Sequence, residues 1–306
     1  MYENSSLIAD WDVLRLMLAI DRHGGVAGAA RHMGVTHATI SRRLARAEAD
    51  AKIAFFERLP AGLKLTAAGQ VILDHARRVE PELHSLERQL VVHEQDLSGP
   101  IRLTIPPALI DRPLADSLAA FAAEHPKVLL EFVGDNSLLN LHQREADLAI
   151  RVTRRPPETL WGRKLTDQNA GFYASARWLA ESALGQGDLS GDVPIISFNS
   201  WPAPVPEKLR AHCPNVRVAA RAEDFIVALQ LVRAGLGMTR IPKVLGDIQP
   251  DLQFVAALGW ESYMPIWILT HPELRKAKRI EALMKHLSRH FTREKHRYIV
   301  TTNAAN

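Results

Sequence analysis

Basic and hydroxyl-bearing side chains recur between residues 36 and 46 at a spacing that places them on one side of a helix. Ile40, Leu44 and Ala47 follow one another at steps of four and three residues, which predicts an inward apolar face. The opposite face then carries Thr36, His37, Thr39, Ser41, Arg42, Arg43 and Arg46. Guanidinium groups bind phosphates and guanine edges, and hydroxyl groups reach either phosphates or bases. This face therefore has the chemistry that binding to double-stranded DNA requires.

The segment around this face is strongly basic. From Arg22 to Lys64 the sequence has eight basic residues against three acidic ones, whereas the formal net charge of the whole chain is only +4. A solvated, arginine-rich helix would show the same charge run without binding anything. Here a turn, a helix cap and helical periodicity coincide at the spacing of one DNA-binding motif, and this coincidence favours DNA binding.

Small and turn-forming residues predict the elements that hold this face. Ala29 and Ala30 allow two helices to approach closely, and Gly34 permits a sharp turn after the first of them. Val35 is placed to fill the core beneath the turn. Thr36 stands at the N-cap position of the second helix. The pattern predicts a helix-turn-helix.

A basic ribbon follows the second helix. Arg58 and Lys64 flank a turn formed by Pro60, Ala61 and Gly62, as at the tip of a two-stranded wing. We expect both basic residues to contact the DNA backbone. Residues 1–66 are thus predicted to form a winged helix-turn-helix, the core of an all-α N-terminal part.

The chain resembles the LysR-type transcriptional regulators in this region and beyond it. Residues 11–19 (WDVLRLMLA) are similar to the first helix of that family, and residues 27–44 (AGAARHMGVTHATISRRL) to its helix-turn-helix. Residues 55–70 (FFERLPAGLKLTAAGQ) are similar to its wing and the start of its linker helix. Gly25, His37 and Ala47 stand where the family usually has serine, glutamine and leucine. The resemblance implies a regulator of promoter DNA, with RNA polymerase as a further partner.

A long apolar stripe follows the wing. Its members alternate at steps of four and three residues, as in the seam of a two-helix coiled coil: Ile72, Ala76, Val79, Leu83, Leu86 and Leu90. This pattern predicts a linker and dimerisation helix over residues 67–97, although the stripe can also pack on its own domain. Pro81 lacks an amide proton, so a kink or break is expected near Glu80. A homodimer would bind an inverted repeat, and the resemblance implies further pairing into a homotetramer.

After residue 100 the sequence changes to short apolar runs that alternate with helical patterns. Runs at 101–105, 128–133, 148–152, 194–198 and 266–270 predict strands, and Leu114, Leu118 and Phe121 share one face of an intervening helix. Alternation of this kind indicates an open α/β sheet with helices on both sides.

The resemblance implies two such α/β lobes joined by two crossing strands, similar to periplasmic solute-binding proteins. On this interpretation an effector domain spans residues 98–292. Its first lobe contains residues 99–166 and 265–291, and its second lobe contains residues 167–264. Residues 293–306 lack periodicity and are expected to fray.

Ligands of open α/β sheets bind beyond the carboxyl ends of the strands. The residues expected there to bind an effector are Pro106, Ala108, Asp135, Asn136, Ser137, Arg151, Thr153, Ser197, Phe198, Asn199 and Thr239, with Arg240 as a further partner for an anion. LysR relatives commonly have hydroxyl side chains where Pro106 and Ala108 stand. Phe198 and Trp201 either form an apolar wall or fill the core of the second lobe. A domain that only oligomerises, without an effector, is an alternative.

Catalysis and cofactors find little support in the sequence. Cys213 precedes a proline, no serine lies in a G-x-S-x-G context, and the thirteen histidines show no metal-ligand spacing. An enzyme with an appended DNA-binding domain is the remaining alternative, and no cofactor is expected. Gly235 and Gly237 fit the end of a helix and the start of a strand better than a nucleotide loop. The lack of a long apolar run or export signal, together with the single cysteine, predicts a cytoplasmic protein that does not contact membranes.

Overall fold

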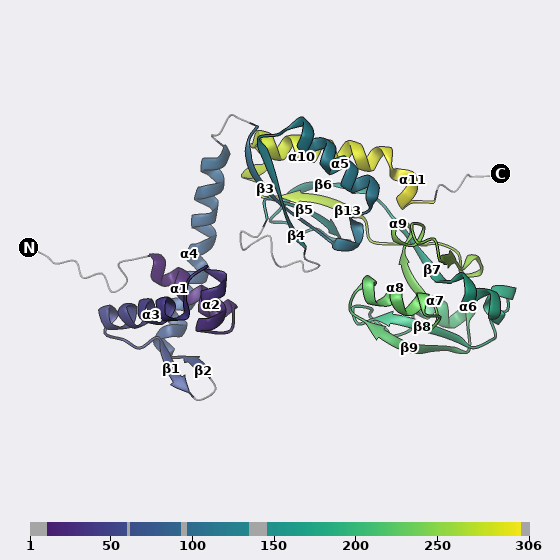
Figure 1. Ribbon diagram of the computed structural model, residues 1–306, viewed down its shortest axis with the longest axis horizontal. Helices are drawn as coiled ribbons and strands as arrows, with labels where there is room; N and C mark the ends of the chain where they lie inside the picture. The colour runs from purple at the N-terminus through teal and green to yellow at the C-terminus, as the bar shows by residue number, and fades with distance from the viewer. Residues whose placement is uncertain (1–10, 60–61, 93–96, 135–145, 301–306) are drawn as a thin grey trace, which may run out of the picture. The chain divides into compact units, whose positions relative to one another are not determined.

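The computed structural model describes residues 11–59, 62–92, 97–134 and 146–300 (Figure 1). The chain forms two compact units, Met1–Arg88 and Gln89–Asn306. Within the described ranges, no helix is long and apolar enough to cross a membrane.

The N-terminal unit is a winged helix-turn-helix, as predicted. Its elements are α1 (Trp11–Arg22), α2 (Val26–His32), α3 (His37–Ala51), β1 (Phe56–Leu59), β2 (Gly62–Leu65) and the start of α4 (Ala67–Val92) (Figure 1). Gly34 has a φ of 66°, the left-handed conformation that the turn between α2 and α3 requires. Thr36 Oγ1 accepts a hydrogen bond from the amide of Thr39 at 3.2 Å, which confirms the expected N-cap.

The core of this unit contains the residues that the periodicity of α3 placed inward, Ile40, Leu44 and Ala47, together with the two small residues Ala29 and Ala30 of α2. Gly28 lies in a closer contact than the small size of Ala29 and Ala30 predicts. A Cβ atom there would lie 1.8 Å from the carbonyl oxygen of His23. Any side chain at this position would clash with backbone, so a glycine is needed for the packing of α1 and α2.

Helix α4 is continuous through Pro81, and the break expected near Glu80 is absent. Thr66 precedes the helix, and its hydroxyl oxygen accepts a hydrogen bond from the amide of Gly69 at 3.0 Å. The linker therefore starts with a capped end and runs on as one piece.

The first two positions of the predicted dimer seam pack on their own domain. Ile72 and Ala76 are buried against the helices of the N-terminal unit. They cannot contact a partner, which corrects the seam expected to start at Ile72. The side chain of Leu90 lies outside the described residues. The seam positions left exposed or half-buried are Val79, Leu83 and Leu86.

The C-terminal unit contains a five-stranded mixed sheet in the order β4-β3-β5-β13-β6. Its strands are β3 (Gly99–Ile105), β4 (Val128–Gly134), β5 (Leu148–Val152), β6 (Trp161–Thr166) and β13 (Ile266–Thr270). Strand β3 is parallel to β4 and β5, whereas β13 is antiparallel to β5 and β6. Helices α5 (Arg112–Glu124) and α10 (Lys278–Arg293) pack beside each other on this lobe (Figure 1). The predicted inward face of α5 is buried, at Leu114, Leu118 and Phe121.

The second lobe is built from two smaller sheets. In one, β7 (Asn169–Ser175) is antiparallel to β10 (Thr239–Pro242), β11 (Leu252–Phe254) and β12 (Glu261–Ser262). In the other, β8 (Val193–Phe198) is parallel to β9 (Val216–Ala222). The helices of this lobe are α6 (Ala176–Glu181), α7 (Glu207–His212), α8 (Phe225–Arg233) and α9 (Lys243–Gly246). The chain crosses between the lobes after β6 and again before β13, which gives the two-lobed α/β fold that the resemblance implies.

The fraying expected after residue 293 is wrong as far as residue 300. Residues Lys295–Tyr298 form the short helix α11. Tyr298 is fully buried, and its ring centroid lies 5.2 Å from that of Phe291. The amide of Val300 donates a hydrogen bond to Asn169 Oδ1 at 2.8 Å. A short polar segment is ordered here because one aromatic side chain enters the core of the first lobe.

Candidate functional site

The outer face of α3 presents the side chains predicted to bind DNA. His37, Arg42, Arg43 and Arg46 are exposed, and Thr39 and Ser41 are half-buried. Within the described part of the chain, no carboxylate pairs with Arg42 or Arg43, while Arg46 lies 3.7 Å from Asp50 in a highly exposed pair. Such an exposed pair contributes little. The guanidinium groups on this face are therefore free to bind an anionic surface.

Two of the hydroxyl groups on this face belong to the helix cap. The hydroxyl oxygens of Thr36 and Thr39 lie 2.9 Å apart, and Ser41 Oγ lies 3.5 Å from His37 Nδ1. These contacts orient the side chains at the N-terminal end of α3. The cap thus positions the same residues that would meet the bases.

The wing places its two basic side chains on opposite faces. Arg58 is the cross-strand partner of Leu63, and Lys64 is the partner of Glu57. Cross-strand partners share a face, and successive residues of a strand alternate between faces. Arg58 and Lys64 therefore point away from each other, so they would contact different phosphates. The predicted wing tip at residues 60–61 lies outside the described residues.

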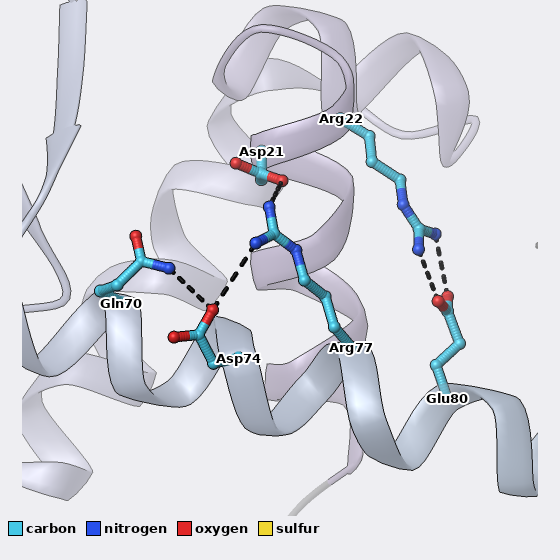
Figure 2. A network of polar contacts seen from close by, with 6 residues as sticks. All are labelled: Asp21, Arg22, Gln70, Asp74, Arg77 and Glu80. Atoms are coloured by element: carbon cyan, nitrogen blue, oxygen red, sulfur yellow. Dashed lines mark hydrogen bonds and ion pairs between the residues drawn. The ribbon is translucent and has the colours of Figure 1, made fainter.

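Ion pairs connect the linker helix α4 to helix α1 of the N-terminal unit (Figure 2). Arg77 of α4 lies 2.8 Å from Asp21 of α1, and Glu80 of α4 holds both terminal nitrogens of Arg22 at 2.9 and 2.5 Å. A bidentate pair of this kind restricts direction as well as distance. The partners are 56 and 58 residues apart in the chain, so no local pattern indicates the contact. The network fixes the direction in which α4 leaves the domain.

A cleft of about 430 Å³ lies within the C-terminal unit and is lined by residues of both lobes. Five of the predicted effector-binding residues line it: Pro106, Ala108, Arg151, Thr153 and Phe198. Asp135, Asn136 and Ser137 lie outside the described residues. The carboxyl ends of β3, β5 and β8 thus meet at one cavity, as the topology of an open α/β sheet requires.

Three predicted effector-binding residues do not line the cleft. Ser197 is fully buried in its strand, and Asn199 is exposed outside the cavity. Thr239 is buried, and its hydroxyl donates to the carbonyl of Ile196 at 2.8 Å, which joins β10 to β8. Side chains alternate between the two faces of a strand, so a place near a strand end does not by itself put a side chain in the cleft.

Aromatic side chains form one wall of the cleft. Phe198 lies 4.9 Å from Phe225 and 5.6 Å from Trp201 between ring centroids, and all three line the cavity. Phe198 also belongs to the core of the second lobe. The two alternatives for Phe198 and Trp201 therefore both apply, because the wall is the surface of that core.

Several polar residues of the cleft were not predicted from the sequence. Gln168 and Tyr263 come from the two crossing segments, and Glu223 and Asp224 come from the end of β9. Burial raises the pKa of the Tyr263 hydroxyl, and the nearby Arg240 and Arg154 act in the opposite direction. Arg240 itself is held by Glu261 at 2.9 Å and does not line the cavity. The sequence offered one indication of Gln168. The resemblance to two-lobed proteins implies strands that cross between the lobes, and Gln168 lies in such a crossing segment.

The conditions for a metal site or a reactive cysteine are not met in the described part of the chain. No group of three histidine, cysteine, aspartate or glutamate residues there is arranged to hold a metal ion. Cys213 is buried, and burial raises the pKa of its thiol. A thiol in this environment is a poor nucleophile.

The fold and the two sites define a DNA-binding protein with an attached ligand-binding domain. Residues 11–70 match the family described as bacterial regulatory helix-turn-helix protein, lysR family, and residues 94–292 match the LysR substrate binding domain. The chain belongs to the LysR family of transcriptional regulators. It is a DNA-binding regulator and not an enzyme, as predicted.

Individual relatives agree with this assignment. The Mau operon transcriptional activator of Paracoccus denitrificans is 26% identical over 269 residues, which cover 87% of this chain and 91% of that protein. A transcriptional regulator of Xanthomonas campestris is 29% identical over 164 residues, which cover 54% of this chain and 48% of that protein. In that second match the chain spans about half the length of the relative.

Solved structures of regulators share the fold. Full-length AphB of Vibrio cholerae, a virulence activator, is similar with a TM-score of 0.59 and 20% identity, over 91% of this chain and 98% of that one. Full-length CbnR in complex with its target DNA has a TM-score of 0.55 and 20% identity, over 93% and 99% of the two chains.

Proposed function

We propose that this regulator binds an inverted-repeat operator as a homodimer, and that a small molecule in the cleft changes operator binding or DNA bending. The exposed basic face of α3 is the observation that supports DNA binding. The structure of CbnR with its target DNA supports this use of the domain. Pairing of two homodimers into a homotetramer and contact with RNA polymerase belong to the same proposal.

We expect the N-terminal end of α3 to read bases and a residue further along the helix to contact the DNA backbone. His37 and Thr39 lie at its N-terminal end and would read bases, whereas Arg42 would bind a phosphate. We expect His37→Ala to relax the preference at one operator position, at a cost of about 1 to 3 kcal/mol. Arg42→Ala is the matched control, and it should weaken binding to all sequences alike. Affinities for the selected operator and for random duplex at one salt concentration give the ratio that decides, and an unchanged ratio in His37→Ala would contradict base reading.

A regulator without an effector is the second candidate. Pro106 and Ala108 lie at the end of β3, and their side chains cannot donate hydrogen bonds to a ligand. This observation favours a regulator that works without an effector. A ligand at a hundred times its dissociation constant raises the stability of the native state by about 2.7 kcal/mol. We expect a thermal-shift screen of small metabolites to reveal such a ligand. Absence of any shift across organic acids, amines and sugars would favour the effector-independent regulator.

A further inference from the structure

The end of the C-terminal unit is strongly basic. Residues 271–300 contain nine basic residues and three acidic ones. This excess of six positive charges is larger than the formal net charge of the whole chain, which is +4, so the other residues together are net acidic. The excess is also larger than that of the segment from Arg22 to Lys64, which contains the predicted DNA-binding face. Neither that face nor the cleft uses this charge.

Helix α10 arranges three of these cations along its outer side. Lys278, Lys285 and Arg289 are exposed and follow one another at steps of seven and four residues, which places them on one side of a helix. The opposite side of α10 is buried in the core of the first lobe, at Leu283 and Leu287 among others. This burial fixes the rotation of the helix, so the three cations are held at the surface together. We call Lys278, Lys285 and Arg289 the α10 stripe.

The cations of the α10 stripe have no carboxylate partner within the described ranges. Two ion pairs of this segment lie beyond the stripe, between Arg293 and Glu294 at 3.0 Å and between Arg297 and Asp111 at 2.7 Å. Exposed cations on other elements of the C-terminal unit have carboxylates 2.7 to 3.3 Å away: Arg102 with Glu131, Arg112 with Asp116, Lys164 with Asp167, Arg177 with Glu181, and Arg217 with Asp192. The stripe is therefore a positive surface that the chain itself does not neutralise.

The α10 stripe fits the phosphate backbone of duplex DNA in charge and in length. A helix rises about 1.5 Å per residue, so Lys278 and Arg289 are separated by about 16 Å along α10. Duplex DNA has one phosphate for about every 1.7 Å of its axis, so a duplex of this length offers several phosphates to each of the three side chains. Lysine and arginine bind phosphates whatever the base sequence. A regular row of unpaired cations is thus suited to DNA that is not read base by base.

The N-terminal unit makes such a contact effective even when it is weak. Residues 11–70 belong to a DNA-binding helix-turn-helix family, so the regulator is already attached to its operator. DNA next to the operator is then present at a high effective concentration for any second site on the same chain. A few phosphate contacts, too weak to hold free DNA, are sufficient under this condition.

We propose that the α10 stripe binds the phosphate backbone of duplex DNA that flanks the operator. It is a second, sequence-independent DNA contact of this regulator, separate from α3 and from the cleft. Because it uses phosphates alone, the affinity that it adds depends on the length of the DNA and on the salt concentration, and not on the base sequence of the flank.

The test compares operator duplexes that differ only in length. The operator is selected from random duplexes with the wild-type chain. The short duplex ends at the outer edges of the operator, and the long duplex continues for about 40 base pairs, roughly 140 Å, on each side. Affinities of the full chain are measured over a range of salt concentrations for the wild type and for Lys285→Gln/Arg289→Gln. Arg210→Gln/Arg221→Gln is the matched control, because it removes two exposed positive charges from α7 and β9, outside the stripe.

On the long duplex, Lys285→Gln/Arg289→Gln should lower the steepness of log affinity against log salt. The expected decrease is about 0.9 for each lost phosphate contact, or about 1.8 for each subunit that contacts the flank. On the short duplex the same variant should keep the wild-type slope, and the control should keep it on both duplexes. Lys285→Arg/Arg289→Lys retains both charges and should also keep the wild-type slope. All four residues are exposed, so unchanged unfolding transitions are expected for every variant.

An unchanged slope for Lys285→Gln/Arg289→Gln on the long duplex would overturn the proposal. An equal decrease in Arg210→Gln/Arg221→Gln would also overturn it, because the effect would then follow the net charge of the chain and not the stripe. A decrease of the same size on the short duplex would place the contact within the operator, against the proposal. If the stripe instead binds an acidic surface of a second copy, the variant would change the sedimentation of the protein and leave both slopes unchanged, and the DNA contact would be wrong.

Discussion

Replacement of Tyr298 by alanine is expected to lower the free energy of unfolding of the C-terminal unit by about 3–5 kcal/mol. The side chain is fully buried in the core of the first lobe, against Phe291. Its removal leaves a cavity that the surrounding sheet and helices fill only in part. Urea denaturation of the full chain measures the change by tryptophan fluorescence, since Trp11 is the only one of the six tryptophans in the N-terminal unit.

Tyr298→Phe is the matched control for this cavity. The hydroxyl of Tyr298 is buried without a hydrogen-bond partner in the described part of the chain, and burial raises its pKa, so it stays neutral. Loss of an unpaired hydroxyl is expected to change the stability by about 1 kcal/mol or less. Equal stabilities of Tyr298→Ala and the wild type would mean that α11 does not contribute to the fold.

The second large effect is expected at the linker helix. Aspartate at both Leu83 and Leu86 would bury like charges across the proposed dimer seam, at a cost of about 3 kcal/mol or more, which is roughly a hundredfold in association. We expect Leu83→Asp/Leu86→Asp to sediment as a monomer and to lose operator binding. The C-terminal unit should keep the unfolding transition of the wild type, because neither residue belongs to its core.

A control on the same helix separates the seam from helix stability. Val71 is 59% exposed and lies outside the seam, so Val71→Asp adds a charge to α4 without facing a partner. This variant should remain dimeric. An intact dimer with unimpaired operator binding in Leu83→Asp/Leu86→Asp would place the seam elsewhere.

The sequence by itself determined the elements whose signals are local. The cap at Thr36, the turn at Gly34 and the inward face of α3 follow from residues only a few positions apart, and the structure confirms them. Strands β5 and β13 agree with the prediction at both ends, because continuous apolar runs mark strands that are buried in a sheet. Strand β9 was missed because most of its side chains are exposed or half-buried, so its sequence lacks such a run.

Only the tertiary structure decided which residues share a cavity or a core. Ile72 fits a coiled-coil seam in the sequence, yet it packs on its own domain, because its phase in α4 faces the core formed by α1 to α3. Tyr298 follows a polar stretch, and its burial depends on the distant first lobe. Gln168 reaches the cleft because the chain crosses between the lobes there, beside Met264, which lies 96 residues further on. Contacts between segments this far apart depend on how the lobes fold and meet, and local periodicity does not indicate them.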